Sequence, residues 1–196
     1  MSILTGIKNL KELFVGAKKA KQIYLGKNLV FEEASAYMLL YDNGTVNGIS
    51  WAANKFNRLN YTAYATAKLY DERMLIQITQ TTNTASYYYN AHVSTAEPVR
   101  VPKNASRLNV SVNGDATNWI VDLKFGLLPG TISNSYDDSK GGQLSSTISA
   151  QGATIKTHSM ELSEDVKGRD DLYVIINGQQ RCDQTRRMYI YNVWFD

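Results

Sequence analysis

The chain closes on RMYIYNVWFD, residues 187–196, and this stretch points to the fold class. In a strand, successive side chains point to opposite faces of the sheet. One face would then hold Tyr189, Tyr191, Val193 and Phe195, and the other Met188, Ile190 and Trp194. A strand that is apolar on both faces lies in the middle of its sheet and is covered on both sides. The sequence therefore predicts a central strand here, with Trp194 in the core.

Similar runs recur upstream, each short and apolar or alternating. They cover residues 36–41, 73–79, 86–93, 107–112, 119–125, 154–162 and 172–176. Turn signals separate many of them, at Asn43-Gly44, Asn47-Gly48, Asn113-Gly114-Asp115 and Asn177-Gly178. Roughly eight to ten strands at this spacing, without a long amphipathic helix, predict an all-β sandwich or barrel. Residues 129–151 are polar and contain glycines, so we expect a long exposed loop or hairpin there.

The N-terminal segment differs from the rest in charge. Residues 1–31 carry a net charge of +5, whereas the remainder carries −2. Gly6, Gly16 and Gly26 recur every ten residues, each after an apolar run, which predicts a small β-meander over residues 1–33 and a second domain over 34–196. The competing interpretation is a helix over residues 7–21, because Leu10, Leu13 and Phe14 have helical spacing.

A meander of this size is too small to be stable alone, so it needs a partner. Its lysines are interpreted either as solvated side chains that keep the strand edges from pairing with other chains or as a docking surface for an acidic partner. The docking candidates are Lys8, Lys18, Lys19, Lys21, Tyr24 and Lys27.

Residues 12–31, ELFVGAKKAKQIYLGKNLVF, resemble the short N-terminal repeat of many phage virion proteins from Gram-positive hosts. The later stretches EPVRVPKNASRLNVSV, NWIVDLKFG, DDLYVIING and RMYIYNVWFD resemble the jelly-roll domains of such proteins. The resemblance implies a virion component made in the host cytoplasm: a short fibre, spike, decoration or baseplate protein. It also implies attachment through residues 1–33, a jelly-roll β-sandwich displayed outward, and a homotrimer. No shaft or coiled coil lies between the two parts, which disfavours a long tail fibre.

Motifs of catalysis are absent from the sequence. It contains no Gly-x-Ser-x-Gly elbow, no phosphate loop and no His-Glu-x-x-His. His92 and His158 are far apart and are interpreted as surface or ordinary strand residues, and Cys182 as a passive thiol. A single cysteine also rules out an internal disulfide. We therefore expect a protein that is not an enzyme.

Aromatic residues are the best signal for binding, because tyrosine and tryptophan rings match the apolar C–H faces of sugars. The candidates are Tyr87, Tyr88, Tyr89, Tyr136 and Trp51. A host-surface glycan is the expected ligand class, and a carbohydrate-binding module of a bacterial surface protein is the alternative function. Asp137 and Asp138 are interpreted as solvated, with calcium as the alternative and no other cofactor.

Composition narrows the partners further. A net charge of +3 over 196 residues gives no argument for nucleic acid. No apolar run approaches the roughly 18 residues of a membrane span. The N-terminus mixes lysines with apolar residues, so the sequence predicts no signal peptide, which counts against an exported surface protein.

Overall fold

The computed structural model describes residues 14–15, 18–19, 22–25, 28–32, 36–44, 48–56, 65–78, 89–115, 120–129, 141–180 and 185–196. All regular structure in these ranges is β-strand, and none of it is a helix that could cross a membrane. The chain divides into two compact units, Met1–Ser35 and Ala36–Asp196.

The first unit contains two antiparallel strand pairs. β1 (Phe14–Val15) pairs with β2 (Lys18–Lys19), and β3 (Gln22–Leu25) pairs with β4 (Asn28–Glu32). The two pairs form separate two-stranded sheets and not one continuous meander. The competing helix over residues 7–21 is wrong for residues 14–15 and 18–19, which are strands.

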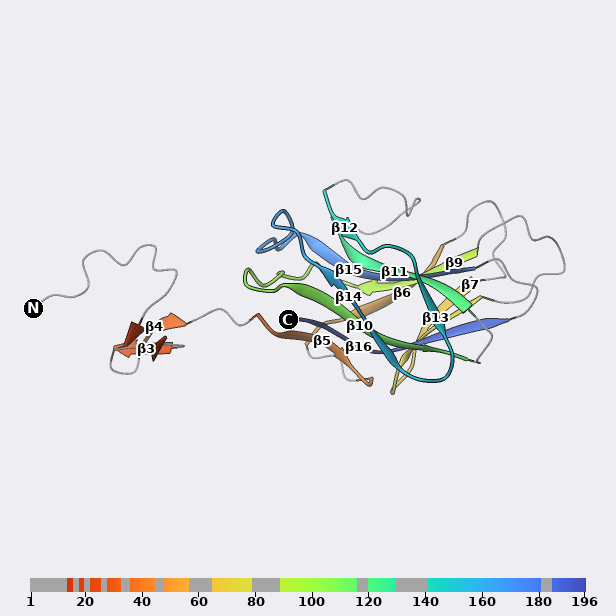
Figure 1. The fold of residues 1–196 in the computed structure, drawn as a ribbon, viewed down its shortest axis with the longest axis horizontal. Coiled ribbons are helices and arrows are strands. Elements are labelled where there is room, and N and C mark those ends of the chain that lie inside the picture. The colour runs from red at the N-terminus through yellow and green to blue at the C-terminus, as the bar shows by residue number, and fades with distance from the viewer. Residues whose placement is uncertain are drawn as a thin grey trace, which may run out of the picture. The chain divides into compact units, whose positions relative to one another are not determined.

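The second unit is a jelly-roll β-sandwich of two antiparallel sheets, as predicted (Figure 1). One sheet, here called the β16 sheet, has the order β14 (Lys156–Glu161), β10 (Arg107–Gly114), β16 (Arg186–Phe195), β8 (Met74–Ile78) and β7 (Ala65–Leu69), with β5 (Met38–Asp42) also paired to β16. The other, the β15 sheet, has the order β12 (Gln143–Leu144), β11 (Ile120–Pro129), β15 (Leu172–Gln180), β9 (Tyr89–Thr95) and β6 (Trp51–Phe56), with β13 (Ile148–Gln151) also paired to β11.

The core lies between the two sheets and draws its side chains from both. Members on β10 and β16 include Leu108, Val110, Ile190 and Phe195, all fully buried. The packing at Gly178 is too close for any side chain, because an added Cβ would stand 2.7 Å from Ile76 Cγ2. The predicted turn at Asn177-Gly178 is therefore wrong, because both residues lie inside β15. Glycine is required at position 178 by the close packing of Ile76 and not by a turn.

β16 is central, as predicted, since it pairs with β10 on one edge and with β8 and β5 on the other. The expected division of its faces is wrong. A register shift opposite Ser111 and Val112 makes Tyr191 an extra residue, so the buried positions change from Met188 and Ile190 to Val193 and Phe195. Trp194 consequently lies on the outer face, half-buried and outside the core.

Four strands were not predicted. β6 and β7 read WAANKF and ATAKL, and their alanine, lysine and asparagine residues disfavour strands intrinsically. β12 and β13 fall inside the segment expected to be a long exposed loop or hairpin, and each pairs with β11. β12 helps to close one edge of the sandwich, since the Gln143 side chain donates to the Glu161 carbonyl at 2.6 Å and accepts from the Ser163 amide at 2.9 Å.

The predicted turn at Asn43-Gly44 needs a glycine because of its backbone conformation and its close neighbours. Gly44 has φ +92, and an added Cβ would stand 1.4 Å from the Asp71 carbonyl oxygen in the turn between β7 and β8. Gly44, just after β5, therefore packs directly against the turn between β7 and β8.

We predict that Gly44→Ala destabilises the protein by more than about 2 kcal/mol, because left-handed strain adds to a backbone collision. Gly48→Ala is the matched control, since Gly48 has φ +72 with nothing within 4 Å of the added Cβ. It should cost only the strain, about 1 kcal/mol. Chemical denaturation measures both, and equal losses would show that the contact with Asp71 does not matter.

Candidate functional site

The outer face of the β15 sheet carries buried polar side chains, at positions where buried side chains are normally apolar. Leu172, Val174 and Ile176 of β15 belong to the core between the sheets. Because side chains alternate along a strand, Asn177 and Gln179 point to the other face. This outer face is the candidate site.

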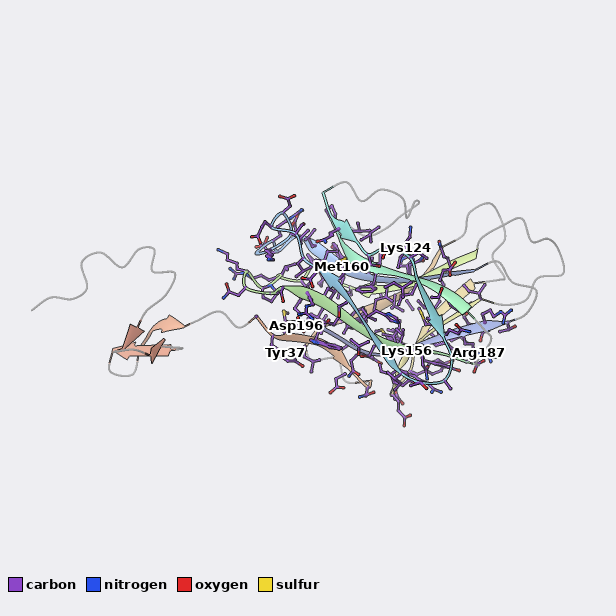
Figure 2. All side chains as sticks on the ribbon, viewed as in Figure 1. Tyr37, Lys124, Lys156, Met160, Arg187 and Asp196 are labelled. Atoms are coloured by element: carbon purple, nitrogen blue, oxygen red, sulfur yellow. The ribbon has the colours of Figure 1, made fainter. Side chains whose placement is uncertain are left out.

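Three side chains form a row across this face, here called the polar row. Asn177 on β15 is in register with Lys124 on β11 and with His92 on β9. Asn177 is 0% exposed and His92 is 1% exposed, whereas Lys124 is half-buried. Figure 2 places Lys124 on the side of the sandwich away from Lys156 and Arg187, which belong to the β16 sheet.

Asn177 is the most unusual member of the polar row. Neither its Oδ1 nor its Nδ2 atom has a hydrogen-bond partner, although both are buried. Buried polar groups are normally satisfied, and each one left without a partner costs free energy. Both polar groups of this amide, one a donor and one an acceptor, are thus held inside the protein without a described partner.

The charges of the site follow from burial. Desolvation lowers the pKa of His92 to about 4, so its imidazole is neutral at neutral pH. Asp122, two residues before Lys124 on β11, has a pKa raised by the same cause. The polar row thus combines one neutral imidazole, one amide and one ammonium group.

A small apolar patch adjoins the polar row on the same face. Leu128 and Ile175 are buried there, with Leu144 packed against them, in a cluster separate from the main core. Ser94, 4% exposed, is in register with Ile175. The face therefore combines buried polar groups with a buried apolar cluster, next to the half-buried Lys124.

The site residues expected from sequence have different fates. Trp51 is 8% exposed, its ring packs on Tyr41 with centroids 6.0 Å apart, and its Nε1–H donates to the Leu40 carbonyl at 3.2 Å. Its indole is therefore part of the core and not a surface platform. Tyr89 begins β9, on the candidate sheet, opposite Gln180.

The remaining expected residues give little structural information. Lys18 and Lys19 form β2 and Tyr24 lies in β3. Outside the described residues lie Tyr87, Tyr88, Tyr136, Asp137, Asp138, Lys8, Lys21, Lys27 and Cys182. The part of the chain that the structure does describe holds no cluster of His, Cys, Asp or Glu fit for a metal ion.

The polar row itself was not predicted. His92 was interpreted as a surface or ordinary strand residue and is buried; His158 is half-buried on β14. One sequence signal was present, namely a single asparagine at the end of the apolar run LYVII, but the Asn-Gly pair was assigned to a turn.

Comparison with known proteins places the fold. No family model matches the sequence, and no curated protein matches it. Among solved structures, an agarase, AgWH50C, is similar with a TM-score of 0.52 at 8% identity, over 83% of this chain and 24% of that one. This likeness shows a shared fold and says nothing about activity.

Two binding modules are similar at lower scores. The family 11 carbohydrate-binding module from Clostridium thermocellum has a TM-score of 0.48 at 13% identity, over 83% of this chain and 96% of that one. The CBM22-1 xylan-binding domain from Paenibacillus barcinonensis Xyn10C has a TM-score of 0.43 at 14% identity, over 83% and 96%.

We predict that the protein loses stability as the pH falls from about 6.5 to about 4. In this window an unfolded His92 binds a proton that the folded one does not, so acid favours unfolding, by up to about 3 kcal/mol in all. His158, whose pKa is also lowered, acts in the same direction, and Asp122 acts against both. Urea denaturation at several pH values measures the slope.

The variant His92→Gln is the control for this prediction. It should flatten most of the pH dependence between about 6.5 and 4, leaving the smaller part due to His158. An unchanged slope in His92→Gln would contradict the assignment to His92.

Proposed function

We propose that the second unit is a carbohydrate-binding domain that acts without catalysis and holds its ligand on the outer face of the β15 sheet. The observation that carries this proposal is the fully buried amide of Asn177, which lacks a partner for either polar atom. Ligand hydroxyl groups are the natural partners, because each one both donates and accepts a hydrogen bond.

The geometry of an amide matches a pair of neighbouring sugar hydroxyls. Its oxygen accepts from one hydroxyl while its nitrogen donates to the next. An unsatisfied buried group costs about 1–3 kcal/mol, so the fold carries this cost in the free protein and recovers it when the ligand binds. Binding thereby gains from a group already held in place.

The rest of the face supports the same ligand class. Neutral His92 adds a hydrogen-bonding ring without a charge, and Leu128 and Ile175 form a buried apolar cluster on the same face. Hydrolysis of a glycosidic bond generally needs two carboxyl groups about 5–10 Å apart. Among the described residues of the polar row and its flanks, Asp122 is the single carboxylate, which favours binding over cleavage.

We predict that Asn177→Leu weakens glycan binding at least about tenfold while it raises stability by about 1 kcal/mol, since an unpartnered amide is replaced by an apolar group of similar size. Opposite signs separate a ligand-binding residue from a structural one. Binding is measured by calorimetry against oligosaccharides of mixed-linkage β-glucan, β-1,4-galactan and xylan, and by pull-down with Gram-positive cell-wall polysaccharide.

The matched control is Asn109→Leu. Asn109 is 2% exposed and its Nδ2 also lacks a partner, but it lies on the β16 sheet and its Oδ1 accepts from Ser159 at 2.6 Å. Binding should be unchanged in this variant. Unchanged binding in Asn177→Leu, or a loss of stability there without a loss of binding, would refute the site.

We further propose that the first unit attaches the protein to a phage particle, with the sandwich displayed outward in a homo-oligomer. The support is the resemblance of residues 12–31 to virion-attachment repeats, together with the size of the strand pairs. Isolated two-stranded sheets are at best marginally stable in water. A pair of strands such as β3 and β4 would therefore be stabilised by packing against the surface of a partner protein.

For this unit we predict that peptides of the chain occur in purified phage particles induced from a bacterium that carries the coding sequence. Particles made with a deletion of residues 1–35 should lack the protein, while the free 36–196 fragment keeps glycan binding. Mass spectrometry of the particles measures the first outcome. Particles without the full-length chain would contradict the attachment role.

A further inference from the structure

A cavity lies on the other sheet of the second unit, away from the polar row. It has a volume of about 590 Å³ and sits on the outer face of the β16 sheet, between the turn of residues 70–73 and the side chains of β8 and β16. Sites for small molecules generally measure about 300–1,000 Å³. The cavity is therefore large enough for one or more sugar units.

The floor of this cavity is apolar. Leu75 lies between Met74 and Ile76, which point into the core, so Leu75 points outward, yet it is only 7% exposed. It is in register with Tyr189 of β16, which also points outward. These two side chains form a surface against which a ligand can rest its C–H groups.

One wall of the cavity is held in position before any ligand arrives. It is the turn between β7 and β8, in which the Tyr70 amide donates to the Arg73 carbonyl at 3.0 Å. Gly44 supports this turn from behind through its close approach to Asp71. A wall fixed in this way lowers the entropy lost on binding.

The polar groups of the cavity carry both signs of charge. The Arg73 guanidinium lies 4.2 Å from the centre of the Tyr189 ring, and no ion pair joins it to a described residue. Arg187 donates to Asp115 at 2.7 Å and to Gln77 at 2.9 Å. Asp71 and Glu72 line the same cavity, so both signs of charge are present, and a strongly charged ligand of either sign meets a repelling group.

We propose that this cavity is a second saccharide-binding site, selective for uncharged sugars. Tyr70, 48% exposed, presents its ring at the rim, Asp71 and Glu72 accept from hydroxyl groups, and Arg73 donates to them. The inference rests on the proposed carbohydrate-binding function. Since the two sites lie on opposite layers, one molecule holds two separate sugar chains at once.

The test is the stoichiometry of the full chain with the same glucan, galactan and xylan oligosaccharides, measured by calorimetry. Wild-type protein should bind two equivalents of the oligosaccharide. Tyr70→Ala and Asp71→Asn should each weaken one of the two sites about tenfold or more and leave the other. Asn177→Leu should remove the other site, and Tyr70→Ala with Asn177→Leu should remove both.

Tyr37→Ala is the matched control, because Tyr37 is 56% exposed and does not line the cavity. It should keep two equivalents, and circular dichroism should show every variant folded. One equivalent in wild type, abolished by Asn177→Leu and untouched by Tyr70→Ala, overturns the second site alone. One equivalent abolished by Tyr70→Ala and kept in Asn177→Leu instead overturns the polar row, and no binding at all overturns both.

Discussion

The hydrogen bonding of β16 on both of its edges is the constraint on which the second unit depends. β10 pairs along one edge, while β8 and then β5 pair along the other, so the first and last strands of the unit are neighbours. The last residue is fixed too, since the Arg107 amide donates to the Asp196 carbonyl at 2.9 Å. A single extra residue, Tyr191, then sets which side chains face inward on either side of it.

That extra residue links the core to the surface. A shift of one residue moves every later side chain of a strand to the other face. Val193 and Phe195 reach the core because of it, and Trp194 is turned outward. Before the bulge, Tyr189 points outward, where Arg73 stacks on its ring. The position of Tyr189 in the cavity floor and the packing of Val193 and Phe195 in the core are therefore linked through the register of β16.

Much of the fold could be predicted from sequence, and the failures have physical causes. The central strand and the upstream runs carry apolar or alternating patterns, and each overlaps an observed strand. β6 and β7 were missed because alanine and lysine form strands only when tertiary pairing requires it. The bulge at Tyr191 leaves no local signature, and Gly178 was assigned to a turn because nothing in the sequence shows that Ile76 stands above it.

The candidate site was harder to predict than the fold, because its parts are far apart in the chain. His92, Lys124 and Asn177 meet only through the order β11, β15, β9, which no local pattern contains. The sequence pattern pointed to aromatic residues instead, and one of them, Trp51, lies in the core. The stronger sign was a polar residue within an apolar strand, since a sheet keeps such a residue at a cost in stability.

The two proposed sites, on opposite layers of the sandwich, would let one molecule adhere through two contacts. Each proposed site alone would make only a few hydrogen bonds and would bind weakly in water, because sugar hydroxyls must first lose their own hydration. On a surface that carries many sugar chains, the second contact of a molecule already held is intramolecular. The effective concentration then raises overall affinity by about 10²–10⁴ without any new interaction. A particle that displays several copies through the first unit would multiply the same effect, so weak sites suffice for firm attachment and still allow single contacts to break and re-form.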